Sequence, residues 1–260
     1  MIKVYFRDSR SMPEVAPESI QAAIISTTEV LFMNPNGQPI LGLTQEFIDN
    51  ISKVQSETGI FFEPFNLWNC YKDMVNEIIR SLKPDGFLIL NVGTPHGNSD
   101  IYRLAKYFRG VQTLYPYIAA DVWLENTSLH LIHDLIVSYK NERRDIAPSL
   151  TVENYVEHFF IYSKQRKKHL TLKSVLNVSA RKIIMNQPFK YFFHSDVIKY
   201  LITKLSQKGD WLLDPLSGSG TFGAVAEKLG RNTVLYEIET NLKPLMVETL
   251  KDCEVEWHEY

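Results

Sequence analysis

The chain has 260 residues, which is enough for one large α/β domain with a substantial core. Apolar residues make up 45% of it and charged residues 22%, ordinary proportions for a globular protein that exclude a disordered or fibrous class. The formal net charge is −2, so nucleic-acid binding would require a local basic face. The two cysteines form no metal or disulfide pattern, and the sequence shows no signal peptide and no apolar run long enough for a membrane helix. These features predict a cytoplasmic protein.

Strand-like and helix-like segments alternate in the first third of the chain. The apolar stretch 2–6 predicts a short strand, and the compact apolar run 20–26 predicts a strand buried in a parallel sheet. Apolar residues at helical spacing predict an amphipathic helix over 66–82, which the sequence Lys-Pro-Asp-Gly should end. Residues 87–93 predict a second buried strand.

The middle of the chain is richer in charged and aromatic side chains. Two strands are expected over 129–140 and 156–164, with a mobile loop over 141–155 between them. The last third alternates again, with a helix, a strand, a helix, a strand and a final helix expected over 194–210, 211–215, 221–230, 232–239 and from Asn241. This alternation predicts an α/β fold in which helices cover both faces of a mostly parallel central sheet.

A glycine loop follows the strand that ends near Asp214. Gly218 and Gly220 precede a helix, so a ligand could approach the loop backbone and the N–H groups of the helix N-terminus. A triphosphate-binding loop would have lysine after its last glycine, whereas this chain has Thr221.

The spacing of Gly218, Gly220 and Gly223 fits a dinucleotide fingerprint, but the nearby carboxylate of Asp214 would repel a pyrophosphate. That carboxylate suits a cationic or hydroxylated ligand better. Glu237 ends the next strand, where it could hold a pair of ribose hydroxyls. The alternative is a strand, turn and helix whose glycines serve packing alone.

The stretch from Asp214 to Glu237 closely resembles the S-adenosylmethionine loop of the amino-group DNA methyltransferases, the N4-cytosine and N6-adenine enzymes. Their pattern runs Asp-Pro-Phe-x-Gly-Ser-Gly-Thr, Leu-Gly-Arg and Ile-Glu-Ile, and this chain has Asp-Pro-Leu-Ser-Gly-Ser-Gly-Thr, Leu-Gly-Arg and Tyr-Glu-Ile. The resemblance implies a Rossmann-like fold that binds S-adenosylmethionine. It assigns cofactor contacts to Asp8, Asp214, Pro215, Ser217, Gly218, Ser219, Gly220, Thr221 and Glu237.

The position of the loop near the C-terminus resembles the permuted (beta-type) group of these enzymes. The resemblance implies one methyltransferase domain over 1–260, with a catalytic half, a target-recognition segment and a cofactor-binding half over 1–110, 111–187 and 188–260. It also implies that Asp8 lies near the adenine of the cofactor, although Arg7 stands where the family has glycine.

The catalytic motif of the family, Asp/Ser/Asn-Pro-Pro-aromatic, should follow the second strand directly. Its polar side chain and a backbone carbonyl accept the hydrogens of the target amine, and its aromatic ring stacks on a base flipped out of the duplex. Here the corresponding residues are Ser26, Thr27, Thr28 and Glu29. Ser26 can accept a hydrogen bond, but the prolines are missing and Glu29 has no aromatic face.

These features leave three functions open. The first is an active DNA methyltransferase with an altered turn, favoured because the cofactor loop is intact. The second is a methyltransferase-like subunit without catalysis that binds S-adenosylmethionine, nucleic acid or both. The third is methyl transfer to RNA or another amine. Serine in the first motif position resembles the Ser-Pro-Pro-Tyr type common among N4-cytosine enzymes, which favours cytosine over adenine.

A basic run over 163–169 predicts DNA contacts. Phosphate binding by these side chains would weaken with salt, and the alternative is a solvated loop. The residues concerned are Lys164, Arg166, Lys167 and Lys168. So short a recognition segment could require a homodimer or a partner subunit. The histidines are scattered, without carboxylates or cysteines to complete a metal site, so no metal is expected.

Overall fold

The computed structural model describes residues 1–26, 64–93, 124, 127–140, 144–147, 150–152, 156–166, 170–179 and 194–259. The helices of this part are α2 (Pro64–Ser81), α5 (Ser195–Leu205), α6 (Thr221–Lys228) and α7 (Lys243–Thr249), with a 3-10 turn at Thr240–Leu242. The strands are β1 (Ile2–Phe6), β2 (Ile20–Ser26), β3 (Leu82–Gly93), β4 (His130–Lys140), β5 (Arg144–Ala147), β6 (Leu150–Val152), β7 (Val156–Ser163), β8 (Val175–Ser179), β9 (Trp211–Asp214), β10 (Asn232–Tyr236) and β11 (Val255–Glu259).

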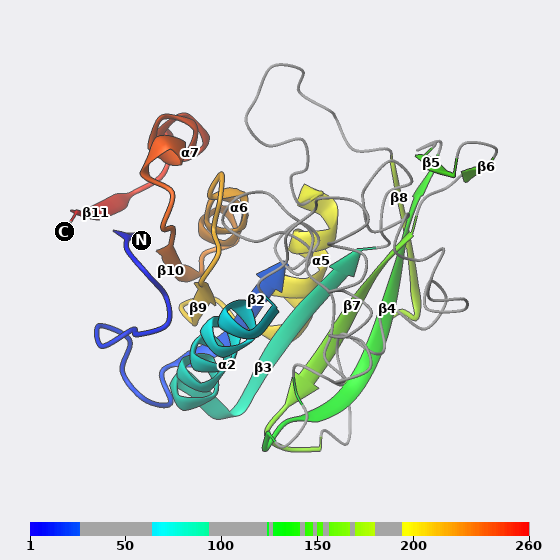
Figure 1. Ribbon diagram of the computed structural model, residues 1–260, viewed down its shortest axis with the longest axis horizontal. Helices are drawn as coiled ribbons and strands as arrows, with labels where there is room; N and C mark the ends of the chain where they lie inside the picture. Colours follow the sequence, from blue (N-terminus) through cyan, green and yellow to red (C-terminus); the bar gives the residue numbers. More distant parts are fainter. Residues whose placement is uncertain are drawn as a thin grey trace.

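Nine of these strands form one sheet in the order β11-β1-β10-β9-β2-β3-β7-β4-β8 (Figure 1). Both pairings of β7 are antiparallel, and every other pairing in this sheet is parallel. The predicted mostly parallel sheet is therefore confirmed. Strands β1, β10, β9, β2 and β3 all end at the same edge, which we call the carboxyl edge, and begin at the opposite, amino edge.

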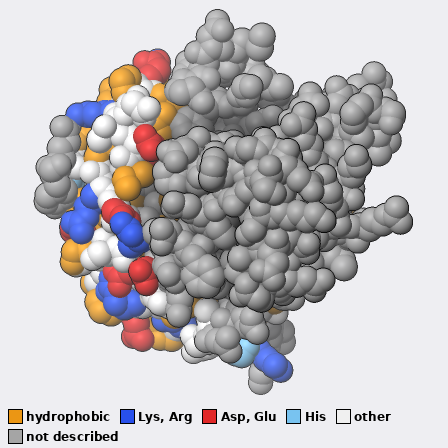
Figure 2. Space-filling model, in the orientation of Figure 1, with side chains coloured by type: hydrophobic (Ala, Val, Ile, Leu, Met, Phe, Trp, Pro, Cys, Tyr) orange, Lys and Arg blue, Asp and Glu red, His pale blue; other side chains and the backbone are white. Residues whose placement is uncertain are grey.

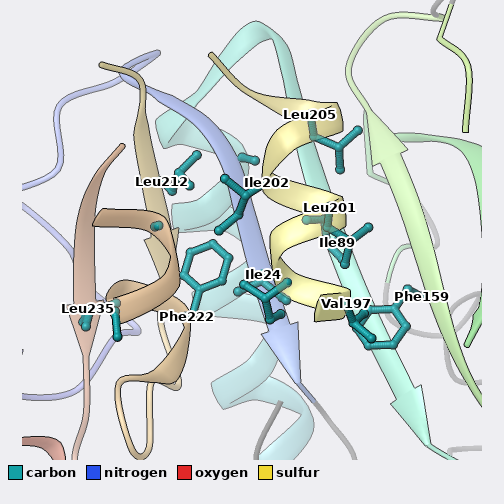
Figure 3. Packing of buried hydrophobic residues seen from close by; sticks show 14 of the residues in the cluster. Ile24, Ile89, Phe159, Val197, Leu201, Ile202, Leu205, Leu212, Phe222 and Leu235 are labelled. Atoms are coloured by element: carbon teal, nitrogen blue, oxygen red, sulfur yellow. The ribbon is translucent and has the colours of Figure 1, made fainter. Parts of the chain in front are cut away.

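Helices cover both faces of the sheet, as expected. Because successive residues of a strand point to opposite faces, β2 contributes Ala23 and Ile25 to one core and Ala22 and Ile24 to the other. The first core is completed by the apolar side of α2, which lies over β2 and β3 in Figure 1. The second core contains α5, α6 and residues of α7, and Figure 3 shows the α5 side chains packed towards β2, β3 and β7.

Two predicted boundaries differ from the structure at the junction of α2 and β3. The helix ends at Ser81 and the strand begins at once, with Leu82 opposite Ile20. The next pair on β3 is Phe87 with Ala22, so the Lys-Pro-Asp-Gly segment bulges out of the ladder. A side chain at Gly86 would come within 3.0 Å of the backbone oxygen of Ile20, so glycine is needed for this close approach.

Two other predictions were incomplete. The tail was expected to be helical from Asn241, but the helix ends at Thr249 and β11 follows it. β11 is a five-residue edge strand with two apolar side chains, Val255 and Trp257, packed against the core, so the run is too short to be recognised by alternation. Within the expected loop 141–155, β5 and β6 pair as an antiparallel hairpin, and its strands are too short to be recognised by alternation.

The remaining surface features fit the ordinary composition. Figure 2 shows acidic, basic and apolar side chains interspersed on the described part of one face. No helix of the described residues is both long and apolar enough to cross a membrane.

Candidate functional site

Asp214 is the last residue of β9, and its side chain is almost fully buried at the carboxyl edge. Its Oδ1 accepts a hydrogen bond of 3.1 Å from the backbone N–H of Leu216. Burial raises the pKa of Asp214 to about 7, with a further contribution from the charge of Glu237, although the Leu216 hydrogen bond opposes the change. A buried carboxylate with so high a pKa is poised to receive a cationic group.

The loop after Asp214 is tied to the neighbouring strand β10. Both the backbone N–H and the hydroxyl of Ser217 donate to the carbonyl oxygen of Tyr236 at 2.9 Å, and the carbonyl of Ser217 accepts from Gly220 N–H at 2.8 Å. Gly218 and Gly220 have φ angles of +50° and +77°, which favour glycine. A side chain at Gly218 would meet nothing within 4 Å, so the loop borders open space at this position.

The other loop residues named from the sequence complete the same turn. Pro215 is buried directly after β9, and the hydroxyl of Ser219 hydrogen-bonds that of Thr221 at 2.8 Å. Thr221 begins α6, so the free N–H groups of this helix face the end of the loop.

Glu237 follows β10 directly and is also buried. Its Oε2 accepts from the N–H of Gly218 at 2.7 Å, and its Oε1 accepts from the N–H of Glu239 at 2.8 Å. Burial raises the pKa of Glu237 against the opposing effect of these hydrogen bonds. Each carboxylate oxygen has two lone pairs, so both can still accept a ligand hydroxyl.

Asp8 lies two residues beyond the end of β1, which pairs with β10. Its Oδ1 accepts from the backbone N–H of Arg10 at 2.9 Å, and its Oδ2 accepts from Arg10 Nε at 2.6 Å. Burial acts to raise the pKa of Asp8, but the hydrogen bonds and positive charge of Arg10 outweigh it and lower the pKa. The structure thus brings an ionised Asp8 to the strand end beside Glu237.

Ser26 is the last residue of β2, and its backbone pairs with Asn91 of β3. Since β2 also pairs with β9, Ser26 and Asp214 end adjacent strands, which are about 4.8 Å apart in a sheet. The backbone of Ser26 is therefore next to the cofactor loop. The other residues of the expected catalytic turn, Thr27, Thr28 and Glu29, lie outside the described residues.

The described part of the basic run is not brought to this edge. Lys164 and Arg166 follow β7, which is antiparallel to β3 and therefore ends at the amino edge. The Nζ of Lys164 donates to the carbonyl oxygen of Leu82, at the start of β3, at 2.7 Å. Lys167 and Lys168 lie outside the described part of the chain.

Sequence reasoning missed a set of polar side chains on the strands beyond Ser26. Asn91 is buried and donates to the carbonyl oxygen of His158 at 3.3 Å, and buried Glu157 accepts from the Tyr139 hydroxyl at 2.7 Å. The imidazole of His158 lies 3.1 Å from the Asp134 carboxylate. A lone polar residue in the apolar strand Phe-Leu-Ile-Leu-Asn was the available signal for Asn91. Among the described residues no cluster of potential ligands could hold a metal ion.

Known proteins resemble this chain over most of its length. The family model of the N6/N4 methyltransferases, described as DNA methylase, matches residues 47–248. The type II methyltransferase M.MthZI of Methanothermobacter thermautotrophicus is 46% identical over 296 residues, covering 96% of this chain and 77% of that protein. M.MjaI of Methanocaldococcus jannaschii is 40% identical over 288 residues, covering 95% and 90%. M.MwoI of Methanothermobacter wolfeii is 27% identical over 159 residues, and this chain spans 22% of its length.

Two solved structures share the fold. TTHA0409 of Thermus thermophilus, complexed with S-adenosylmethionine, has a TM-score of 0.59 and 16% identity, covering 99% of this chain and 100% of that one. The PvuII DNA methyltransferase has a TM-score of 0.58 and 15% identity, covering 97% and 94%. Because the family model matches more than half of the chain, and two relatives exceed 30% identity over nearly all of it, this chain belongs to the N6/N4 family of S-adenosylmethionine-dependent DNA methylases.

Proposed function

We propose that this chain transfers a methyl group from S-adenosylmethionine to an exocyclic amine of DNA, N4 of cytosine or N6 of adenine. The observation that carries the proposal is the pair of buried carboxylates, Asp214 and Glu237, at adjacent strand ends around a glycine loop. The donor has a sulfonium, an ammonium group and a ribose diol. It therefore needs an anionic partner for its cationic groups and acceptors for its hydroxyls, in a site that excludes water. The two buried carboxylates can supply both.

The described residues fit this cofactor. We assign the cationic methionine part to Asp214, the ribose hydroxyls to Glu237 and the adenine side to Asp8. The open space at Gly218 leaves room for the ligand beside the loop backbone. In this proposal the other loop residues hold the loop in shape and line its ligand side: Pro215, Ser217, Ser219, Gly220 and Thr221.

Methyl transfer requires the amine nitrogen to approach the methyl carbon in line with the bond from carbon to sulfur. The nitrogen lone pair would form the new bond to the methyl carbon while the electron pair of the carbon–sulfur bond passes to sulfur, which leaves as a neutral thioether, and the amine would lose one proton to solvent. We assign the orientation of the amine to Ser26 with the adjoining Thr27, Thr28 and Glu29, on a base flipped out of the duplex. The serine favours cytosine, and PvuII methyltransferase, a cytosine-N4-specific enzyme, has the same fold.

The second candidate is a subunit that binds the cofactor or DNA without catalysis. The observation that favours it is the missing Pro-Pro-aromatic sequence after Ser26. DNA is the proposed partner of the enzyme, and the proposed site of action is the cytoplasm. Three further expectations stay predictions: assembly as a homodimer or with a partner subunit, target recognition by residues 111–187, and phosphate contacts by Lys164, Arg166, Lys167 and Lys168.

The test is transfer of labelled methyl from S-adenosylmethionine to unmethylated duplex DNA of mixed sequence. The wild-type protein should label the DNA, and digestion of the product should identify the base. Asp214→Ala should lower transfer at subsaturating cofactor about tenfold to a hundredfold, because a charge-assisted interaction contributes about 1.5–3 kcal/mol.

The matched control is Asp210→Ala, at the other end of the same strand, where the carboxylate bonds Lys83 Nζ at 2.8 Å. This variant should keep its activity below the temperature at which it unfolds. Folded wild-type protein that labels no DNA would contradict the proposal and favour the second candidate.

A further inference from the structure

The connection between β1 and β2, residues 7–19, contains no helix in the structure. We call it the β1–β2 loop. It begins at the carboxyl edge after Phe6 and returns to the amino edge at Ile20. Met12 and Val15 of the loop are buried in the core on the α2 side of the sheet. The loop thus covers part of the sheet face that a crossover helix normally covers.

The carboxylate of Glu14 joins this loop to β10. Its Oε2 accepts a hydrogen bond of 2.9 Å from the hydroxyl of Tyr236, and its Oε1 is hydrogen-bonded to Nη1 of Arg7. Tyr236 is fully buried, and its ring stacks on Tyr5 of β1 with the centroids 5.1 Å apart. The hydroxyl of Tyr236 therefore has little freedom to move away from Glu14.

The two partners of Glu14 stand next to the two carboxylates assigned to the adenosine part of the cofactor. Arg7 directly precedes Asp8, and Tyr236 directly precedes Glu237. One side chain therefore links the chain segment before Asp8 to the chain segment before Glu237. Nothing in the local sequence indicates this link, because Glu14 and Tyr236 are far apart in the chain.

The middle of the loop has a second, separate attachment to α2. Oε2 of Glu77 accepts from the N–H of Met12 at 2.8 Å, and Arg80 donates to the carbonyl oxygens of Met12 and Val15 at 2.9 Å. The hydrogen bond from Arg80 lowers the pKa of Glu77, so this carboxylate stays ionised. The part of the loop nearest Asp8 is held within itself. Arg7 donates to the carbonyl oxygen of Ser11 at 3.2 Å, and Arg10 donates hydrogen bonds to Asp8. Glu14 connects this part of the loop to β10.

We propose that Glu14 is a positioning residue for S-adenosylmethionine, which sets Asp8 relative to Glu237 by holding Arg7 and Tyr236 together. The proposal rests on the proposed function, since it requires Asp8 and Glu237 to contact the cofactor. A site that is arranged before binding loses less conformational freedom when the ligand arrives. Loss of the link should weaken cofactor binding without changing the methyl-transfer step.

The experiment uses Glu14→Ala, Tyr236→Phe and the double variant in the full chain. Titration calorimetry should show that each single variant raises the dissociation constant for S-adenosylmethionine about threefold to tenfold, a modest effect because the lost hydrogen bond orders the site and does not contact the cofactor itself. The double variant should bind S-adenosylmethionine as tightly as the single variant with the lower affinity, because both changes break the same link. At saturating cofactor, kcat and the KM for DNA should match the wild type.

Two further variants separate positioning from stability. Glu14→Gln keeps an acceptor for the Tyr236 hydroxyl without the charge. Its affinity for S-adenosylmethionine should lie between those of Glu14→Ala and the wild type. If Glu14→Ala unfolds, Glu14→Gln can still be compared with the wild type. Lys83→Ala removes the Lys83–Asp210 pair at the amino edge, and it should lower the melting temperature with unchanged cofactor affinity.

Cofactor affinities of Glu14→Ala and Tyr236→Phe equal to that of the wild type would overturn the proposal. Additive losses in the double variant would overturn it as well. If the wild-type protein itself fails to bind S-adenosylmethionine, the proposed function is wrong and this proposal falls with it, a result that is distinct from the first two.

Discussion

The carboxyl group of Asp214, to which we assign the cationic part of the cofactor, lies in an environment that is unfavourable for its charge. Deep burial removes its hydration, and the charge of Glu237 adds repulsion, so the pKa rises from 3.8 to about 7. The folded protein therefore holds this proton more tightly than the unfolded chain does. Stability contributed by the protonated form is complete below about pH 4 and is lost as the pH rises to about 7.

Asp214→Asn should consequently stabilise the cofactor-free protein, and by more at pH 8 than at pH 4. Asparagine can keep the hydrogen bond from Leu216 N–H while removing the titration. Three pKa units correspond to roughly 4 kcal/mol, which is the upper limit of the gain at pH 8. Urea denaturation at both pH values measures this difference.

The same variant should bind S-adenosylmethionine more weakly, since the cationic group loses its partner. Asp210→Asn is the control and should lower stability, because it removes the negative charge that pairs with Lys83. A gain for Asp214→Asn that is the same at both pH values would show that titration of this carboxyl is not the cause.

At the scale of elements, the loop between β9 and α6 has two glycines with the same backbone requirement and different surroundings. A side chain at Gly220 would lie 3.0 Å from Met246 Cγ and 3.3 Å from Leu250 Cδ1. A side chain at Gly218 would meet open space. Gly220 therefore serves the packing of the loop on α7, and Gly218 borders open space, the side on which we propose that the cofactor binds.

Gly220→Ala should lower stability more than Gly218→Ala, whereas Gly218→Ala should lower cofactor affinity more relative to its effect on stability. Both variants meet a left-handed backbone cost of about 1–2 kcal/mol. Only Gly220→Ala adds a contact with α7, and only Gly218→Ala places a methyl group in the open space. Thermal unfolding and cofactor titration measure the two effects.

Gly209→Ala is the matched control for these variants. Gly209 has a φ of +85° with nothing within 4 Å, and it precedes β9 at the amino edge. It should show the backbone cost alone, with unchanged cofactor affinity. Equal affinities for Gly209→Ala and Gly218→Ala would exclude a ligand-facing role for Gly218.

At the scale of the whole molecule, the two ends of the chain meet in neighbouring strands. β1 pairs with both β10 and β11, Ile2 lies opposite Val255, and the termini lie near one another in Figure 1. Because β1 and β11 are parallel, a connection from the C-terminus to the N-terminus must run back along the strand. Five residues of strand span about 16 Å, which a linker of about eight residues can bridge.

A circular permutant opened between residues 187 and 188, with the original ends joined by such a linker, should fold and bind S-adenosylmethionine. The joined chain keeps every strand pairing of the nine-stranded sheet. Lengthening a surface connection costs little, about 0.6 kcal/mol for each doubling of its length. Circular dichroism would test whether the permutant folds, and cofactor titration would test whether it binds S-adenosylmethionine. An unfolded permutant would show that a break between residues 187 and 188 divides a unit that must stay continuous to fold.

The sequence by itself determined the order of strand, glycine loop and helix from β9 to α6. Strand β9, the loop and α6 are contiguous, and the need for glycine at Gly218 and Gly220 follows from local backbone geometry, so their order could be recognised directly. The helices and strands from α5 to α7 followed from apolar periodicity for the same local reason, whereas β11 was missed. The family resemblance rested on this contiguous stretch, and the family model and two relatives confirmed it.

Only the tertiary structure decided which distant residues act together. Parallel pairing brings the end of β1 beside the end of β10 and the end of β2 beside the end of β9, and no local pattern specifies these neighbours. The antiparallel direction of β7 places Lys164 at the opposite edge, although its sequence suggested a DNA contact. The raised pKa of Asp214 and the bond from Tyr236 to Glu14 likewise depend on burial and on contacts between segments far apart in the chain.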